Sequence, residues 1–231
     1  MRPVIFLGES LQIAELRETC DLLGMTIAGI IDDDFYGNTA EFDGIPYIGS
    51  EKTVDWQALK RDHDFFITVN PIPSVPRNVV KRKNFIDLVD YHDLPCVNII
   101  DPECRISPRA KLGKGIYVGY SAYIALNAEI GDHCQIHFNS GVMHNTVFGR
   151  NSVLQRASMT TAHVTVGENV YIAPGAKIMQ WHTKVGNDSF IQSGVMVFRD
   201  VEPGETINIT GKKIYSVIAD FADTVKDRAS D

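Results

Sequence analysis

Apolar residues recur at every sixth position through the second half of the chain, from Ile100 to about Val201. Every member of this series except Thr160 is aliphatic or aromatic, and the register holds until one residue is inserted before Val185. The series consists of Ile100, Ile106, Leu112, Val118, Ile124, Ile130, Ile136, Val142, Phe148, Leu154, Thr160, Val166, Ile172 and Ile178, and then of Val185, Ile191 and Val197. The position after each member is often glycine or another small residue.

A period of six matches neither an amphipathic helix, which repeats about every 3.6 residues, nor an alternating strand. It matches a short strand plus a turn, with the aliphatic side chain pointing into a narrow core. Three such hexads close one triangular coil of about 18 residues, as in hexapeptide β-helices. Buried strands of an ordinary sheet would produce this register only by accident. We therefore expect residues 98–213 to form a parallel β-helix, whose hand the repeat alone does not determine.

The first part of the chain, residues 1–97, instead alternates strand and helix patterns. Apolar runs bounded by turn residues predict strands, and apolar residues at helical spacing predict helices. The expected strands are 3–8, 25–34 and 64–70, and the expected helices are 10–24, 52–60 and 77–91. This order is typical of a small α/β domain with a parallel, Rossmann-like sheet. Residues 214–231 are expected to form a C-terminal helix or tail.

The carboxyl edge of that sheet is a candidate ligand site, because ligands of parallel α/β sheets bind beyond the carboxyl ends of the strands. Gly8 closes the first strand, and Asp32, Asp33 and Asp34 close the next. A carboxylate there can accept hydrogen bonds from ribose or base groups. Gly8, Asp32 and Asp33 are therefore candidate substrate-binding residues, and a solvated acidic turn is the alternative interpretation.

Composition and charge narrow the class of protein. Hydrophobic residues make up 44% and charged residues 22%, which is typical of a soluble globular chain. A net charge of −7 without a basic stripe argues against non-specific binding of nucleic acid. No apolar stretch is long enough to predict a signal peptide or membrane insertion. The four cysteines form no CxxC pair, which favours buried free thiols and a cytoplasmic location.

Three of the seven histidines, His144, His163 and His182, fall in related places of the repeat. Their hexads are three apart, so they lie on one side of the triangle in successive coils. A neutral imidazole at a coil corner suits a general base near neutral pH, and three histidines together suit zinc. The position within the hexad advances by one from each histidine to the next, which argues against a common focus. For His163 and His182, ordinary polar turn residues are the alternative interpretation.

The stretch AEIGDHCQIHFNSGVMHNTVFGRNSVL, followed by VTVGENVYIAPGAKI, resembles the bacterial sugar acyltransferases of the PglD/NeuD type. The resemblance rests on Asn139-Ser140-Gly141, Val142-Met143-His144-Asn145 and Phe148-Gly149, and on residues 28–34, 44–46 and 200–213. It implies a left-handed β-helix and an N-terminal domain that binds a nucleotide sugar. It also implies transfer of an acetyl group from acetyl-CoA to the amine of a nucleotide-linked amino sugar, or to a hydroxyl of sialic acid or another sugar.

The resemblance implies roles for individual residues as well. His144, beside Asn145, is expected to act as the general base in direct transfer, and the backbone N–H of Ala162, one coil further on, is expected to stabilise the oxyanion. Asn139 and Ser140 are candidate substrate-binding residues. Acetyl-CoA is expected in a groove between two solenoids of a homotrimer, where it would contact Thr161, Ala162, His163, Ala173 and Ile178. No metal is expected.

The sequence departs from the family pattern at several positions. Gly8 is followed by Glu-Ser-Leu-Gln in place of a glycine-rich loop, and Met143 and Asn145 flank His144 where the family often has an acidic neighbour. Val153 stands where the family has a further histidine. Two other functions therefore stay open: a non-catalytic binding or scaffold protein, and a zinc enzyme like the γ-class carbonic anhydrases. The sugar, the nucleotide, and acylation on nitrogen or oxygen also stay open.

Overall fold

The computed structural model describes residues 1–209 and 213–215. Contacts divide the chain into two compact units, Met1–Pro102 and Glu103–Asp231, close to the boundary expected between residues 97 and 98. The expected C-terminal helix or tail, 214–231, begins within strand β24 (Lys213–Tyr215). Its remaining residues, 216–231, lie outside the described part of the chain.

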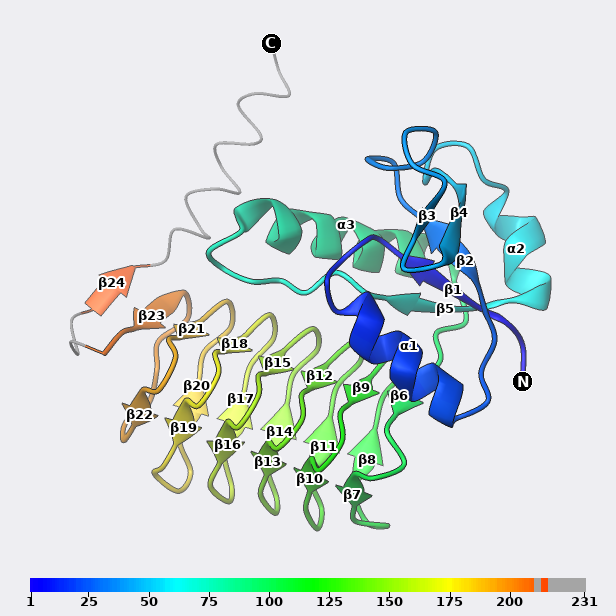
Figure 1. Ribbon diagram of the computed structural model, residues 1–231. Helices are drawn as coiled ribbons and strands as arrows, with labels where there is room; N and C mark the ends of the chain where they lie inside the picture. The colour runs from blue at the N-terminus through cyan, green and yellow to red at the C-terminus, as the bar shows by residue number, and fades with distance from the viewer. Residues whose placement is uncertain (210–212, 216–231) are drawn as a thin grey trace. The chain divides into compact units, whose positions relative to one another are not determined.

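The first unit is built on a five-stranded sheet with the strand order β3-β4-β2-β1-β5 (Figure 1). Its strands are β1 (Val4–Leu7), β2 (Ile27–Ile31), β3 (Glu41–Phe42), β4 (Ile45–Gly49) and β5 (Asp64–Ile67). Its helices are α1 (Ile13–Leu22), α2 (Trp56–Asp62) and α3 (Pro76–His92), and the short strand β6 (Ile99–Ile100) follows them. Every pairing in this sheet is parallel except that of β3 with β4, so the predicted parallel α/β domain is confirmed.

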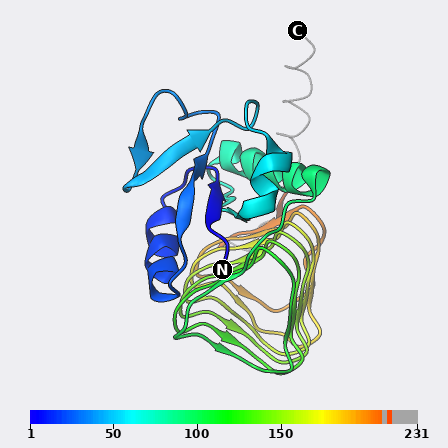
Figure 2. The same cartoon turned by 90° about the vertical axis from the view of Figure 1, so that its right-hand side faces the viewer.

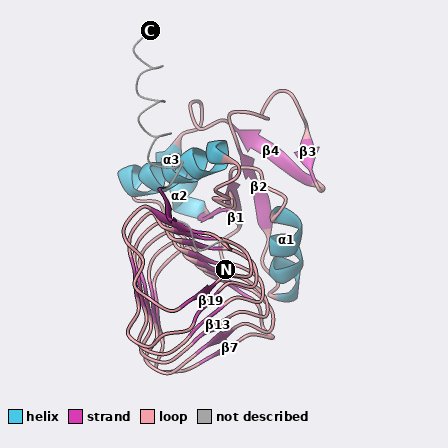
Figure 3. Ribbon diagram, turned by 90° about the vertical axis from the view of Figure 1, so that its left-hand side faces the viewer, coloured by secondary structure: helices cyan, strands magenta, loops and turns pink. Residues whose placement is uncertain are grey.

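The strands of this sheet are continuous apolar runs because both of its faces are covered. Ile5 and Leu7 of β1 and Phe65 and Ile67 of β5 belong to one buried cluster, to which Phe85 of α3 also belongs. The alternate residues of the same strands face the opposite side, along which α1 lies (Figure 3). This packing holds the carboxyl ends of β1 and β2 side by side at one edge of the sheet.

The second unit is a parallel β-helix of two-residue strands with a triangular cross-section (Figure 2). The strands are β7 (Arg105–Ile106), β8 (Lys111–Leu112), β9 (Tyr117–Val118), β10 (Tyr123–Ile124), β11 (Glu129–Ile130), β12 (Gln135–Ile136), β13 (Gly141–Val142), β14 (Val147–Phe148), β15 (Val153–Leu154), β16 (Met159–Thr160), β17 (Thr165–Val166), β18 (Tyr171–Ile172), β19 (Lys177–Ile178), β20 (Lys184–Val185), β21 (Phe190–Ile191) and β22 (Met196–Val197). Each strand pairs with the strand one coil away, so Ile124 lies beside Val142.

These strands stack into three sheets, one for each side of the triangle. The first contains β7, β10, β13, β16, β19 and β22, and the second contains β8, β11, β14, β17 and β20. The third contains β9, β12, β15, β18 and β21, followed by β23 (Glu205–Ile207) and β24. The three hexads per coil that the sequence predicts are therefore confirmed.

The six-residue series fills the interior of the solenoid. Ile124, Val142 and Ile178 are fully buried, and so is Thr160, the polar member of the series. The Thr160 hydroxyl accepts a hydrogen bond from the backbone N–H of Met143 at 3.3 Å. Thr160 is tolerated in the core because this bond satisfies its polar atom.

The corners of the triangle are marked by residues in the left-handed conformation. Apart from glycines, the corner residues with positive φ are Ser121, Asn127, His133, Asn139, Asn145, Asn151, Ala157, His163, Asn169, His182 and Asp188. Asparagine, aspartate and histidine adopt this conformation more readily than most residues. The backbone of the corners therefore explains in part why histidines recur there.

Candidate active site

One corner of the solenoid gathers three imidazole rings and an indole. It is formed by the turns that follow β13, β16 and β19, and we call it the histidine corner; its residues are His144, Asn145, Ala162, His163, Trp181 and His182. The ring centroids of His144 and His163 are 5.4 Å apart, and those of His163 and His182 are 4.9 Å apart. The three predicted histidines therefore form one cluster.

His182 lies against His163 because the turn after β19 contains one extra residue. Strand β16 pairs with β19 as Met159 with Lys177, whereas β17 pairs with β20 as Thr165 with Lys184. The extra residue returns His182 to the corner position of His163, and both have a φ of 60°. The shift by one hexad position that the sequence shows between His163 and His182 therefore does not move the two rings apart. Within residues 1–209 and 213–215, no group of three or more His, Cys, Asp or Glu side chains is arranged to hold a metal ion.

A row of side-chain hydrogen bonds runs along the histidine corner. Nδ2 of Asn127 donates to Oδ1 of Asn145 at 2.9 Å, and Nδ2 of Asn145 lies 3.3 Å from Nε2 of His163. An amide nitrogen can only donate, so Nε2 of His163 is the acceptor and Nδ1 carries the proton of the neutral ring. Asn145 therefore fixes the tautomer of His163 and leaves the half-buried His144 ring to other partners.

Ala162 lies between His144 and Trp181 along this corner and is only 2% exposed. The N–H groups on either side of it are used within the solenoid: Thr161 donates to the carbonyl of Ile178 at 2.8 Å, and His163 donates to that of His144 at 3.0 Å. The N–H of Ala162 has no backbone acceptor among the described residues. It is the donor of this turn that remains for a ligand oxygen.

The other residues predicted on the solenoid lie elsewhere in the same chain. Asn139 and Ser140 belong to the corner between β12 and β13, where Ser140 is 2% exposed and donates its hydroxyl proton to the carbonyl of His137. Ala173 follows β18 on another side of the triangle, and the side chain of Ile178 is fully buried in the interior. The structure thus brings His144, Asn145, Thr161, Ala162 and His163 together, and the backbone carbonyl of Ile178 adjoins them through Thr161. Asn139, Ser140 and Ala173 lie apart from this group.

Trp181 is a member of the histidine corner that the sequence analysis missed. Its ring centroid lies 6.4 Å from that of His144 and 5.8 Å from that of His163, yet the residue is 58% exposed. The available signal was the interval of seven between Ile178 and Val185, because an interruption in a regular repeat marks an altered turn.

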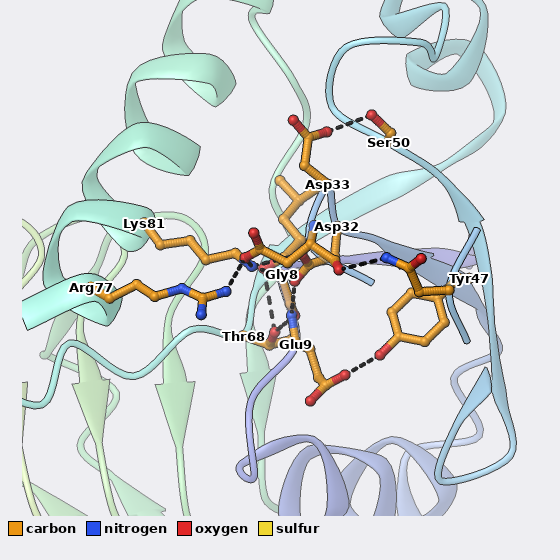
Figure 4. Close-up of polar contacts among 12 residues, drawn as sticks. Gly8, Glu9, Asp32, Asp33, Tyr47, Ser50, Thr68, Arg77 and Lys81 are labelled. Carbon is orange, nitrogen blue, oxygen red and sulfur yellow. Dashed lines mark hydrogen bonds and ion pairs between the residues drawn. The ribbon is translucent and has the colours of Figure 1, made fainter. Parts of the chain in front are cut away.

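A second polar cluster occupies the carboxyl edge of the sheet in the first unit (Figure 4). Gly8 has a φ of +84°, and a Cβ there would lie 2.3 Å from Cγ2 of Val69, so this position requires glycine. Asp32 is fully buried, and its carboxylate accepts hydrogen bonds from the N–H groups of Glu9 at 2.6 Å and Asp34 at 2.9 Å. Lys81 of α3 contacts both of its oxygens, at 2.6 and 2.7 Å.

Asp32 is therefore committed to contacts within the protein, which tie β1 and α3 to the end of β2. Both oxygens of Asp32 thus have partners within the protein, and a ligand contact of Asp32 stays a prediction. Asp34 is bound by the same lysine at 2.6 Å and by Arg77 at 2.5 Å. The hydrogen bond from Lys81 lowers the pKa of Asp34 against the opposing effect of burial, and Arg77 adds to the lowering.

Asp33 differs from Asp32, because it is partly exposed and contacts groups at the rim of the edge. Ser50 donates to it, and Nζ of Lys52 lies 2.6 Å away. Burial acts to raise the pKa of Asp33, but hydrogen bonds from Glu51, Lys52 and Ser50 outweigh it, and the net shift is downward. Burial and the neighbouring Asp33 raise the pKa of Glu51 to about 7. Glu51 thus keeps its proton under mildly acidic conditions and donates a hydrogen bond to the Asp33 carboxylate.

Comparison with known proteins identifies the architecture. No protein-family model and no curated protein matches the sequence. PerB from Caulobacter crescentus, solved in complex with CoA and GDP-perosamine, is 25% identical over 92% of this chain and 97% of its own, with a TM-score of 0.78. WeeI from Acinetobacter baumannii AYE is 17% identical over 93% of this chain and 100% of its own, also with a TM-score of 0.78.

A third solved structure is the acetyltransferase domain of PglB from Neisseria gonorrhoeae FA1090 in complex with acetyl coenzyme A. It is 18% identical over 92% of this chain and 99% of its own, with a TM-score of 0.65. The fold predicted from the sequence, a small parallel α/β unit followed by a left-handed β-helix, is confirmed across almost the whole chain. No helix in the described part of the chain is long and apolar enough to cross a membrane.

Proposed function

We propose that this chain, which has the fold of the hexapeptide-repeat sugar N-acetyltransferases, transfers an acetyl group from acetyl-CoA to the amino group of a nucleotide-linked amino sugar. The observation that carries the proposal is that His144 lies one coil from the N–H of Ala162 at the same corner, and that this N–H has no backbone acceptor among the described residues. A base and an oxyanion donor are the two groups that acyl transfer requires. The likeness to PerB, solved with CoA and GDP-perosamine, supports this choice of donor and acceptor.

The reaction follows from these two groups. The sugar amine attacks the thioester carbonyl carbon, and a carbon–nitrogen bond forms while an imidazole nitrogen of His144 accepts a proton from the amine. The Ala162 N–H donates to the carbonyl oxygen as negative charge develops on it. When the tetrahedral intermediate collapses, the carbon–sulfur bond breaks and the proton on His144 passes to the leaving thiolate. The products are the amide and CoA with a free thiol.

The first unit supplies the acceptor site in this proposal. Gly8 and Asp33 lie at the carboxyl edge of its sheet, where the nucleotide of a nucleotide sugar would be bound. Asp32 acts there through Lys81 and the N–H of Glu9, which it holds in place. Thr161, Ala162 and His163 would contact acetyl-CoA, and a neighbouring subunit of a homotrimer would close the groove.

Replacement of His144 by alanine tests the proposal. We expect kcat/KM for acetyl transfer to fall by roughly 10²–10⁴-fold, because a positioned general base contributes that much. Binding of CoA, measured by calorimetry, should persist, because it requires no proton transfer to His144. The acceptors are GDP-, UDP-, dTDP- and CMP-linked amino sugars, and the assay follows release of the CoA thiol.

His63→Ala is the matched control, because His63 follows α2 in the first unit and its ring bonds, among the described residues, the carbonyl of Leu59 in that helix. Its activity should equal that of the wild type. Unchanged turnover in His144→Ala would remove His144 as the base. Wild-type protein that binds CoA but acetylates none of these acceptors, nor a sugar hydroxyl, would instead support a non-catalytic solenoid.

A further inference from the structure

The position of Trp181 is unusual for an exposed aromatic residue. It lies in the one turn of the described solenoid that carries an extra residue, between β19 and β20, and it is 58% exposed. Its indole lies beside the histidine corner, because its ring centroid is 6.4 Å from that of His144 and 5.8 Å from that of His163. The turn therefore presents an apolar plane beside the proposed base.

The distances show that Trp181 reaches back over the intervening coil. Neighbouring coils of a parallel sheet are about 4.8 Å apart, so residues two coils apart are separated by about 9.6 Å along the axis. The ring centroids of His144 and Trp181 are only 6.4 Å apart. The two side chains therefore lean toward each other along the axis, and Ala162, in the intervening coil, is only 2% exposed.

This arrangement limits the space for an acyl group. In the proposed reaction the attacking amine lies between His144 and the thioester carbonyl carbon, while the carbonyl oxygen meets the N–H of Ala162. The rest of the acyl group must then fit beside the indole. Carbon atoms in contact are about 3.5–4.0 Å apart, so a gap of 6.4 Å between ring centroids accommodates no chain that runs between the two rings. A longer acyl chain on this path would meet the indole and would have to displace it, whereas an acetyl group ends before it.

We propose that Trp181 forms the wall that restricts the acyl donor of this protein to acetyl-CoA. The proposal rests on the acyl-transfer function assigned above, and it assigns Trp181 a role in selectivity and not in the chemical step. Because Trp181 is 58% exposed, we expect its replacement to leave the solenoid folded.

Acyl selectivity of Trp181→Ala is the first test. The ratio of kcat/KM for butyryl-CoA to that for acetyl-CoA should rise at least tenfold over the wild type, since a single methylene in an apolar pocket is discriminated by roughly 10–200-fold. Trp181→Phe should give an intermediate ratio. Met179→Ala, in the same turn and 39% exposed, is the matched control and should keep the wild-type ratio. An unchanged ratio in Trp181→Ala, with acetyl transfer intact, would overturn the proposal.

A binding measurement separates this proposal from failure of the proposed function. The chain has two tryptophans, and Trp56 is 6% exposed, so Trp56→Phe leaves Trp181 as the sole indole. Titration of that variant with acetyl-CoA should quench or shift the fluorescence of Trp181, and butyryl-CoA should bind more weakly. If the protein shows no turnover but acetyl-CoA still changes the fluorescence of Trp181, the proposed acetyl transfer is refuted and the contact of Trp181 with the acyl donor stands. Saturable acetyl-CoA binding without any change in Trp181 fluorescence would refute the wall.

Discussion

Individual residues at the corners of this solenoid both form the backbone turn and hydrogen-bond to neighbouring coils. Asn145 and His163 adopt left-handed backbone conformations that the turn requires, and their side chains also hydrogen-bond along the axis. The same occurs at another corner, where Asn151 donates to Asn169 at 2.9 Å and Asn169 donates to Asp188 at 3.0 Å. Such rows satisfy polar groups between coils. The turn alone is therefore enough to explain a histidine in one of these rows. A catalytic role for such a histidine needs separate evidence.

Titration of the single residue Glu51 should make the stability of the fold depend on pH. The pKa of Glu51 is raised to about 7 from an ordinary value of 4.5, by burial and by Asp33. A group with a raised folded-state pKa stabilises the fold below its unfolded pKa and loses that contribution as the pH rises through the folded one. The midpoint of thermal unfolding should therefore fall between pH 4.5 and pH 7 beyond what other groups cause. Glu51→Gln should reduce this fall.

The control for that measurement is Glu41→Gln, because Glu41 is an exposed residue of the edge strand β3. It should keep the pH profile of the wild type. A Glu51→Gln profile that coincides with the wild type across this range would show that Glu51 ionises normally.

Residue roles were predictable from the sequence only where the repeat or the resemblance marked them. The roles of His144 and Ala162 were predicted from the family resemblance, with the offset of one coil relating the two positions, and they stay predictions. The burial of Asp32 was not predictable, because its partner Lys81 lies 49 residues away on α3 and no local pattern signals that pairing. Trp181 was missed for a similar reason: its importance depends on a distance across two coils.

At the scale of elements, the two-residue strand and its corner form the repeating unit of the second half of the chain. Its register could be read from the sequence, because each interior position is buried and each strand has only two residues. The exception was the turn after β19, where counting hexads without the extra residue misplaces His182 relative to His163. In the first unit the strands β1, β2 and β5 and the three helices were predicted in order, but β4 and the antiparallel edge strand β3 were not.

Close stacking of coils leads to a prediction about Gly149. A Cβ at this position would lie 2.6 Å from the carbonyl carbon of Gly167 and 2.8 Å from the nitrogen of Glu168, so the next coil would have to shift. Overpacking of this kind costs about 1–3 kcal/mol. Gly149→Ala should lower the free energy of unfolding by that amount in urea denaturation.

Gly141→Ala is the matched control in the same unit, since a Cβ there meets only the end of the Met143 side chain at 3.4 Å and Met159 Cβ at 3.7 Å. Its stability should change by less than about 0.5 kcal/mol. If both substitutions change the free energy of unfolding equally, the spacing between coils adjusts to an added Cβ and the prediction for Gly149 is wrong.

At the scale of the whole molecule, the two polar clusters belong to different units. The histidine corner lies in the second unit, and the cluster around Asp32 lies in the first. The division between the units was predictable, because the six-residue period begins where the α/β pattern ends. The periodicity alone predicts no assembly, because every coil presents similar corners to solvent.

The expected assembly is a homotrimer, since one solenoid leaves Trp181 and the half-buried His144 open on one side. Light scattering coupled to gel filtration should give three times the monomer mass of 25.7 kDa. Specific activity should fall on dilution below the range in which the trimer persists. A fully active monomer would contradict a groove built from two subunits.

The extra residue between β19 and β20 has a consequence for how such chains diverge. Strand pairing resumes at once beyond it, with Val166 beside Val185, so the change in length is confined to a single corner. Natural insertions and deletions at that corner would alter the donor that the protein accepts while the ancestral coils stay in place. Selectivity in a lineage of such proteins would then evolve by adding or losing one codon, and would require no redesign of the interior.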